Sequence, residues 1–338
     1  MKIGLMVTRV DAATTVAAAR AGEAHGHDSM WLVEDLWHRG TLPLATACAL
    51  ATERIRIGVG VLNPYTLHPT LFAMNYGSLA EVTEGRAVLG MGSSVKSWVE
   101  QMGLEHRLPR TMVKESVEIA RELLAGKRSS YQGKAFQIDG IELGFKVDQP
   151  TPMFIGAMGE RTVRTAGEIA DGWIVSILEP AGYVRAAKQW LREGAEQAGR
   201  DPEEIEVVQY FPFSCSSDSA SAKAAAKAMI AVFIEGEIEL YRRQKSVMAA
   251  LSGYLETVSP EEYLQVLERL NAGVDPVDAI TDELADELSI SGTPEECAAQ
   301  LRRYRDAGVT EAALVPAGMD IEDAAAVVGR DIRPLLAS

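Results

Sequence analysis

The feature that most constrains the fold is a regular alternation of two kinds of segment along the whole chain. Short runs rich in Val, Ile and Leu are followed by longer Ala- and Glu-rich stretches with helical spacing. Parallel strands joined by crossover helices produce this alternation. We count eight such units and predict a (β/α)8 barrel, also called a TIM barrel. The predicted strands are residues 2–7, 28–35, 54–61, 86–92, 152–157, 172–176, 206–214 and 312–318.

Two stretches do not fit the repeated unit. Residues 129–147 contain short alternating runs separated by glycines, which predicts a hairpin insertion. The roughly one hundred residues between the last two strands are too many for one crossover and predict several helices, with a helical insertion at about 215–290. We expect a single domain over residues 1–338, in which both insertions form the wall and lid of a site at the barrel mouth.

A doubly wound Rossmann sheet is the rival fold. Gly58 and Gly60 follow a predicted strand, as the glycines of a dinucleotide-binding turn do. Asn63 stands where the third glycine of that fingerprint is needed, and Pro64 interrupts an immediate helix. The sequence therefore favours the barrel.

Composition limits the possible partners. The formal net charge of −15 leaves no basic surplus for a nucleic acid or an anionic membrane. No apolar run reaches the roughly 18 residues of a membrane span. The three cysteines, Cys48, Cys215 and Cys297, form no CxxC pair, and no His, Asp or Glu group has metal-ligand spacing. We expect a cytoplasmic protein with a small-molecule substrate, no disulfide framework and no metal.

Glycines gather where the predicted strands end. Gly60, Gly90, Gly92, Gly156 and Gly159 lie at or just beyond strands three, four and five. In a barrel these ends share one mouth, where active sites are found. Each glycine by itself is explained by a tight turn, but five at one mouth favour access for a flat ring such as a flavin.

Residues 154–174 carry the most specific local signal. A strand ends there in small residues and a helix begins near Gly159, so free backbone N–H groups are predicted to hold a phosphate or another anion. Arg161 and Arg164 either add positive charge at this point or lie on the solvated surface.

The chain resembles the bacterial-luciferase-like superfamily of flavin and deazaflavin enzymes over nearly its full length. Within it, the chain is most similar to enzymes that use coenzyme F420, a deazaflavin, such as methylenetetrahydromethanopterin reductases. The matching stretches are VEDLWHRG at 33–40, IGVGVLNPYTLHP at 57–69, EGRAVLGMGSS at 84–94, FIGAMGERTVRTAGEIADGW at 154–173 and SGTPEECAAQLRRYRDAGV at 291–309.

This resemblance implies the positions of the site residues. A non-prolyl cis peptide bond is expected at Gly60-Val61, backing the central ring, with Asn63 beside the ring. Gly92 and Ser93 or Ser94 are expected near the ribityl chain. Gly156 and the turn formed by Ala157, Met158 and Gly159 are expected to hold the phosphate through backbone groups.

The resemblance also places Asp35 near the pyrimidine ring or the point of hydride transfer. Glu34 and Asp35 are adjacent and would face opposite sides of a strand, so only one enters the barrel side. Many relatives carry a histidine directly after the strand-two acid, whereas Leu36 follows Asp35. His38 is the remaining candidate proton donor, or else a packing residue.

The function implied is hydride transfer between coenzyme F420 and a small organic substrate at the barrel mouth. An FMN-dependent luciferase-like monooxygenase is the main alternative, and a flavin-binding protein without turnover is the second. Sugar-phosphate dehydrogenases of the family have an acid shortly after the fourth-strand glycines, where this chain has Ser93, Ser94 and Val95. Relatives are often dimers, so a homodimer is expected.

Overall fold

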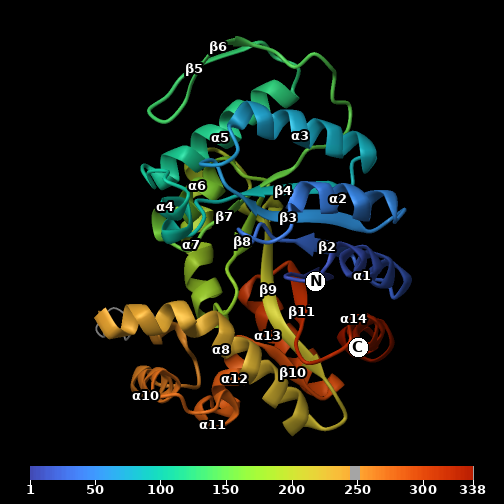
Figure 1. Cartoon of the computed structure of the whole chain (residues 1–338), viewed down its shortest axis with the longest axis vertical. Coiled ribbons are helices and arrows are strands. Elements are labelled where there is room, and N and C mark those ends of the chain that lie inside the picture. The colour runs from blue at the N-terminus through green and yellow to red at the C-terminus, as the bar shows by residue number, and fades with distance from the viewer. Residues whose placement is uncertain (244–251, 338) are drawn as a thin grey trace.

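A closed parallel barrel forms the centre of the protein. The computed structural model describes residues 1–243 and 252–337, and within these residues eight parallel strands form the barrel. Neighbouring strands follow the order β9-β11-β1-β2-β3-β4-β7-β8, and pairing between β8 and β9 closes the ring (Figure 1). The strands are β1 (Lys2–Val7), β2 (Ser29–Leu32), β3 (Arg56–Leu62), β4 (Ala87–Met91), β7 (Met153–Gly156), β8 (Gly172–Val175), β9 (Glu206–Cys215) and β11 (Glu311–Pro316).

Helices cover the outside of this barrel and confirm the predicted crossover units. Their starts follow ordinary capping chemistry: the side chain of Asp11 accepts a hydrogen bond from the backbone N–H of Thr14, and Thr293 and Glu296 form a reciprocal capping box. The helices are α1 (Ala12–Ala24), α2 (Thr41–Leu50), α3 (Pro69–Val82), α5 (Pro109–Leu124), α6 (Glu160–Ile169), α7 (Ala181–Gln197), α13 (Pro294–Ala307), α14 (Ile321–Val327) and α15 (Arg333–Ala337).

Large side chains fill the barrel interior. Trp31, Phe154 and Tyr210 pack there with aliphatic residues of the other strands, and the ring centroids of Trp31 and Tyr210 are 5.9 Å apart. A Cβ atom on Gly58 would lie 2.4 Å from Trp31, so Gly58 makes room for that ring. The Gly58-Val-Gly60 pattern therefore serves barrel packing, which rules out the rival interpretation as a dinucleotide-binding turn.

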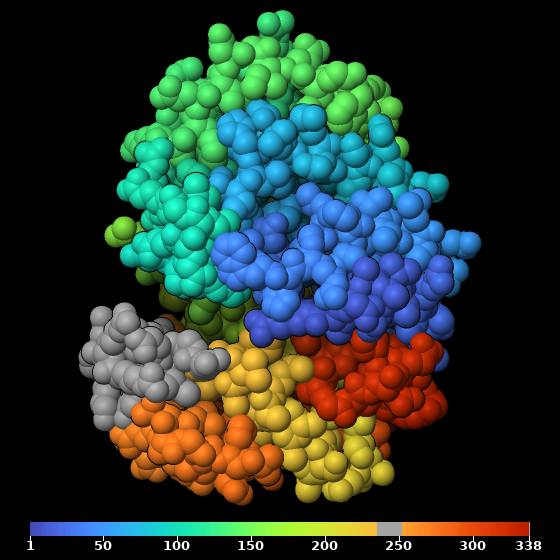
Figure 2. Space-filling model, in the orientation of Figure 1, coloured from blue at the N-terminus to red at the C-terminus, as the bar shows by residue number. Residues whose placement is uncertain are grey.

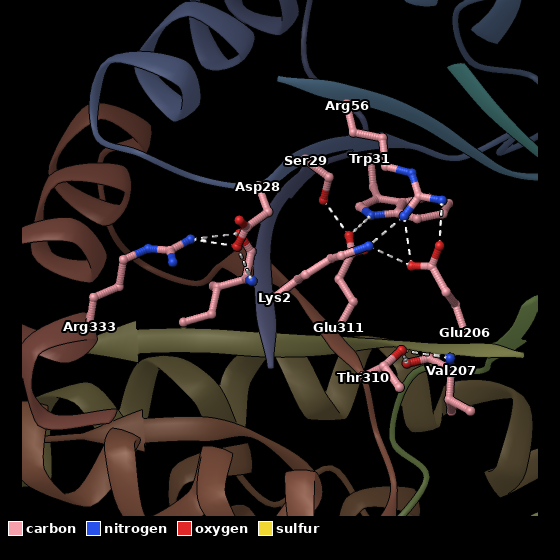
Figure 3. A network of polar contacts seen from close by, with 11 residues as sticks. Lys2, Asp28, Ser29, Trp31, Arg56, Glu206, Val207, Thr310, Glu311 and Arg333 are labelled. Carbon is pink, nitrogen blue, oxygen red and sulfur yellow. Dashed lines mark hydrogen bonds and ion pairs between the residues drawn. The ribbon is translucent and has the colours of Figure 1, made fainter. Parts of the chain in front are cut away.

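A buried polar network closes the end of the barrel opposite the mouth (Figure 3). The guanidinium of Arg56 is bound by both carboxylate oxygens of Glu206, at 2.8 and 2.9 Å. Glu311, which is fully buried, accepts hydrogen bonds from Ser29 and from the indole N–H of Trp31. Lys2 adds a second cation to Glu206 at 2.8 Å. Every charged group in this network thus has an opposite charge or a donor, as burial requires.

The predicted hairpin is present as β5 (Ser129–Gln132) and β6 (Gln137–Ile141), but it lies outside the helix layer (Figure 1). Acids of α5 hold it: Glu115 accepts from the backbone N–H groups of residues 134–136, and Glu118 and Glu122 accept from Tyr131 and Ser129. The hairpin therefore does not form the substrate wall that we expected.

The helical insertion lies at the opposite end of the molecule from the hairpin (Figures 1 and 2). It has a small apolar core of its own, built from residues such as Ile230, Leu267 and Leu284. Met229 packs against the side chains of the barrel interior, so the insertion reaches the barrel. Its described elements are α8 (Ser219–Arg243), η2 (Ser252–Tyr254), α10 (Pro260–Asn271), α11 (Pro276–Ala279), α12 (Asp282–Leu288) and the short strand β10 (Ile290–Gly292), which pairs with β9.

The remaining elements include two departures from the prediction. The polar loop expected after β4 contains a short helix, α4 (Lys96–Gln101), and β10 was not foreseen. The predicted second strand, 28–35, ends at Leu32. Glu34 and Asp35 therefore lie beyond the strand, where the alternation of faces no longer applies. The elements η1 (Pro202–Glu204) and η3 (Val328–Ile332) are the last of those within the described residues.

Candidate functional site

Asn63 connects the ends of β2 and β3 at the barrel mouth. Its side-chain oxygen accepts hydrogen bonds from the backbone N–H groups of Tyr65 and Thr66, at 3.2 and 3.1 Å. Its side-chain nitrogen donates to the carboxylate of Glu34 at 2.9 Å. Because Asn63 is buried and all these contacts are short, its orientation is fixed before any ligand binds.

Glu34 is the acid that sequence reasoning passed over. Burial raises the pKa of its carboxyl group, and the hydrogen bonds from Asn63 only partly offset this effect. A partly buried acid with a raised pKa at a barrel mouth is a candidate for proton transfer. Strand alternation indicated that only one of Glu34 and Asp35 would enter the barrel side, and the resemblance selected Asp35; neither argument reported which acid is buried.

Asp35 lies at the rim and is already paired. Its carboxylate accepts a hydrogen bond from the hydroxyl of Thr8 at 2.8 Å and from Nε of Arg9 at 3.1 Å. These contacts tie the end of β2 to the end of β1. Asp35 is therefore brought to the mouth as predicted, while any contact with a cofactor or substrate stays a prediction.

His38 is exposed, one turn beyond Asp35. Its backbone N–H donates to the carbonyl of Asp35 at 3.2 Å, and its side chain lines a shallow hollow together with Arg9, Asp35 and Arg39. The preceding Trp37 has a positive φ of 70° and is also exposed. The structure places His38 on the rim of the mouth, and its role as a proton donor stays a prediction.

The peptide bond between Gly60 and Val61 is cis, as predicted. The carbonyl of Gly60 accepts a hydrogen bond from the buried hydroxyl of Tyr210 at 3.2 Å. The side chain of Val61 extends toward β4 and β7: Cβ atoms on Gly92 and Gly156 would lie 2.5 and 2.6 Å from it. Val61 thus forms a small apolar surface supported by two neighbouring strands.

This packing changes the interpretation of the mouth glycines. Gly90, Gly92 and Gly156 are required by the close approach of Val61 and Ile174, and Gly60 by the approach of Tyr210. Gly159 differs, because a Cβ atom there would meet no other atom within 4 Å. Four of the five glycines shape the floor of the mouth, and only Gly159 faces open space.

The turn at residues 157–159 is fixed from behind. The indole N–H of Trp173 donates to the carbonyl of Ala157 at 2.8 Å, and the hydroxyl of Tyr183 donates to the carbonyl of Met158. With both carbonyls held, the turn leads into α6, which begins at Glu160 and has no side-chain cap at Gly159. The helix start expected near Gly159 is present and has no side-chain cap, while anion binding there stays a prediction.

The two arginines near this turn behave differently from each other. Arg164 forms ion pairs with Glu160, at 3.0 Å, and with Glu193. Arg164 is therefore already neutralised, which favours the second of the two alternatives given for it, a surface group, over a phosphate contact. Arg161 is exposed on the first turn of α6.

Ser93 and Ser94 follow β4 at the mouth and lie against a histidine that sequence reasoning did not consider. The ring of His106 has Nε2 3.0 Å from the carbonyl oxygen of Ser93 and stacks on Tyr65 at a centroid distance of 4.9 Å. His106 belongs to no recognisable motif, and it lies twelve or more residues from its partners. Only the fold brings it to the site.

The described residues contain neither a metal-binding group nor a membrane-spanning helix. Across residues 1–243 and 252–337, no group of three or more His, Cys, Asp or Glu side chains is arranged to hold a metal ion. Within the same ranges, no helix has the length and apolarity needed to cross a membrane.

With this geometry established, comparison with known proteins identifies the family. Residues 3–311 match the family model described as luciferase-like monooxygenase. The chain belongs to the luciferase-like family. The fold of this family member is likewise close to solved structures, one of which is the coenzyme F420 dependent tetrahydromethanopterin reductase from Methanopyrus kandleri. That structure superimposes with a TM-score of 0.85 at 25% identity, covering 98% of each chain.

Two curated relatives of this luciferase-like chain have named activities. A 5,10-methylenetetrahydromethanopterin reductase from Methanolobus tindarius is 31% identical over 316 residues, which are 93% of this chain and 94% of the relative. An F420-dependent glucose-6-phosphate dehydrogenase from Nakamurella multipartita is 28% identical over 331 residues, covering 94% of this chain and 91% of the relative. Both relatives are oxidoreductases that match nearly the whole chain.

Proposed function

We propose that the protein is a coenzyme F420-dependent oxidoreductase that transfers a hydride to or from a small organic substrate at the barrel mouth. The observation that carries the proposal is that one barrel mouth holds both the apolar side chain of Val61, packed against Gly92 and Gly156, and the N-terminus of α6, which has no side-chain cap. A flat ring needs an apolar surface on one face, and its phosphate needs N–H donors. The names of the relatives support F420 over FMN.

The residues of the mouth fit such a cofactor. Val61 supplies the apolar surface, and the backbone N–H groups after Gly159 supply anion contacts. The fixed turn at Ala157 and Met158 keeps these N–H groups in place without further ordering on binding. When bound, the deazaflavin supplies the hydride donor or acceptor.

Hydride transfer to a substrate is balanced by one proton, and the chain must position a group for it. We propose Glu34 for this task, because its raised pKa keeps a proton available and Asn63 fixes its orientation. Asp35 and His38 are the alternatives on the rim, as the resemblance and the sequence suggested. Asp35 is already engaged by Thr8 and Arg9, whereas the only side-chain contact described for the Glu34 carboxylate is the one from Asn63.

A turnover assay tests this function. Reduced F420 is mixed with the protein and, in turn, with methylenetetrahydromethanopterin, with simple ketones and with activated alkenes, while oxidised F420 is tested with glucose 6-phosphate and secondary alcohols. We expect substrate-dependent oxidation or reduction of F420 with no uptake of oxygen. Oxygen consumption with reduced FMN and a substrate would instead support the monooxygenase alternative. Tight binding without turnover across the panel would support a non-catalytic flavin-binding protein.

We further propose that the protein acts in the cytoplasm as a homodimer. The three thiols are free and buried, which suits a reducing compartment. Helices α2 and α3 leave Leu50, Leu71 and Met74 exposed, and exposed large apolar side chains favour a partner.

A further inference from the structure

His106 is held from two directions at the edge of the mouth. Its Nε2 atom lies 3.0 Å from the carbonyl oxygen of Ser93, and its ring stacks on Tyr65 with an angle of 28° between the planes. A carbonyl oxygen only accepts hydrogen bonds, so Nε2 carries the proton in this contact. Tyr65 is itself fixed, because its hydroxyl donates to the carbonyl of Arg107 at 3.0 Å.

The hydrogen bond from His106 sets the direction of one peptide group. The C=O and N–H of a trans peptide point in opposite directions. Since the carbonyl of Ser93 points to His106, the N–H of Ser94 points away from it. In the described part of the chain this N–H donates to no other group, whereas the N–H of the nearby Gly92 donates to Leu62 at 2.9 Å.

The backbone conformation of Ser94 needs stabilising contacts from elsewhere in the protein. Its φ of 59° lies in the left-handed region, which residues other than glycine rarely adopt. Such a conformation persists only where contacts with the rest of the protein stabilise it. The hydrogen bond from His106 to the carbonyl of Ser93 is a contact of this kind, because it fixes the peptide group between Ser93 and Ser94. The free N–H of Ser94 is therefore a consequence of the position of His106.

We propose that His106 is a positioning residue that presents the N–H of Ser94 as a hydrogen-bond donor to an oxygen atom of the bound cofactor. The inference rests on the proposed function, because Ser93 and Ser94 are expected beside the cofactor. His106 acts through the Ser93-Ser94 peptide and needs no contact with the substrate. Because the N–H of Ser94 is already held in place, the cofactor gains this hydrogen bond without the entropic cost of ordering the loop.

Two substitutions separate this role from simple packing. His106→Gln keeps an N–H donor near the position of Nε2, and His106→Phe keeps a ring over Tyr65 without a donor. We expect the Kd of the cofactor to stay within about twofold for His106→Gln and to rise roughly three- to tenfold for His106→Phe, the value of one hydrogen bond. His25→Gln, at the C-cap of α1 and hydrogen-bonded to Glu322, is the matched control and leaves the Kd unchanged.

The Kd is measured by fluorescence titration with F420 and with FMN, and thermal unfolding verifies that each variant folds. Normal binding by His106→Phe would overturn the inference, since a ring alone would then suffice. Weak binding by His106→Gln would also overturn it. A third outcome would also overturn it: His106→Gln binds the cofactor normally, but turnover is lost and the rate no longer falls on one side of its pH optimum. His106 would then transfer a proton and would not be a positioning residue.

A measurement without cofactor tests the premise separately. Amide hydrogen exchange should show the N–H of Ser94 exchanging rapidly in the free protein and slowing when F420 binds. Slow exchange in the free protein would overturn the inference, whichever cofactor is used. Wild-type protein that binds neither F420 nor FMN overturns the proposed function, whereas equal binding by wild type and His106→Phe overturns only the role of His106.

Discussion

At the scale of single residues, two adjacent acids at the mouth have different environments. Burial raises the pKa of the Glu34 carboxyl group, and the hydrogen bond donated by the amide of Asn63 only partly offsets this effect. Asp35 accepts hydrogen bonds from the hydroxyl of Thr8 and from the guanidinium of Arg9. One chain segment therefore presents a partly buried acid next to an ion-paired one, an arrangement suited to distinct roles.

A matched pair of variants tests this division. Glu34→Gln preserves size and the hydrogen bond with Asn63 but removes the titrating group, and we expect kcat to fall by roughly a hundredfold, in the range of general acid-base catalysis. Asp35→Asn weakens the contact with Arg9 and is expected to lower kcat less. Steady-state kinetics with F420 and thermal unfolding measure both effects. A larger loss in Asp35→Asn would show that the choice made from sequence was the right one.

At the scale of secondary structure, the strongly periodic elements were predictable. The barrel strands and most crossover helices follow from the alternation of buried runs and helical stretches, because each strand must be covered by the helix that follows it. The cis bond at Gly60-Val61 came from resemblance, since no local spacing distinguishes it. Short elements such as α4 and β10 were missed because a few residues carry too little periodicity.

Contacts between elements explain the remaining errors. Three contacts at the site join segments that are separate along the chain. They are the packing of Val61 against Gly92 and Gly156, the hydrogen bond from His106 to Ser93, and the ion pair of Arg164 with Glu193. Single-sequence patterns report local conformation and burial. They predicted where the site lies, but not which of its polar groups are already paired.

At the scale of the whole molecule, the polar network below the barrel predicts acid sensitivity. Burial by itself would raise the pKa of Glu206, but the hydrogen bonds and charges of Arg56 and Lys2 outweigh it and hold that pKa below its usual value of 4.5. The stability contributed by Glu206 is therefore present above pH 4.5 and is lost as the pH falls through the lowered pKa.

Urea unfolding of wild type and Glu206→Gln measures this contribution. The free energy of unfolding should be lower in the variant at neutral pH, and the difference should shrink as the pH falls below 4.5 through the lowered pKa of Glu206 in the wild type. Glu203→Gln, whose acid is an exposed partner of Arg192, is the control and should show little difference at either pH. A difference between wild type and Glu206→Gln that is independent of pH would contradict the account.

The central claim is that F420 is the cofactor that binds at the barrel mouth. A competitive fluorescence titration of the purified protein with F420 and FMN measures the affinity for each cofactor directly. We predict a Kd in the micromolar range or below for F420 and much weaker binding of FMN. Micromolar binding of FMN without measurable binding of F420 would contradict the central claim.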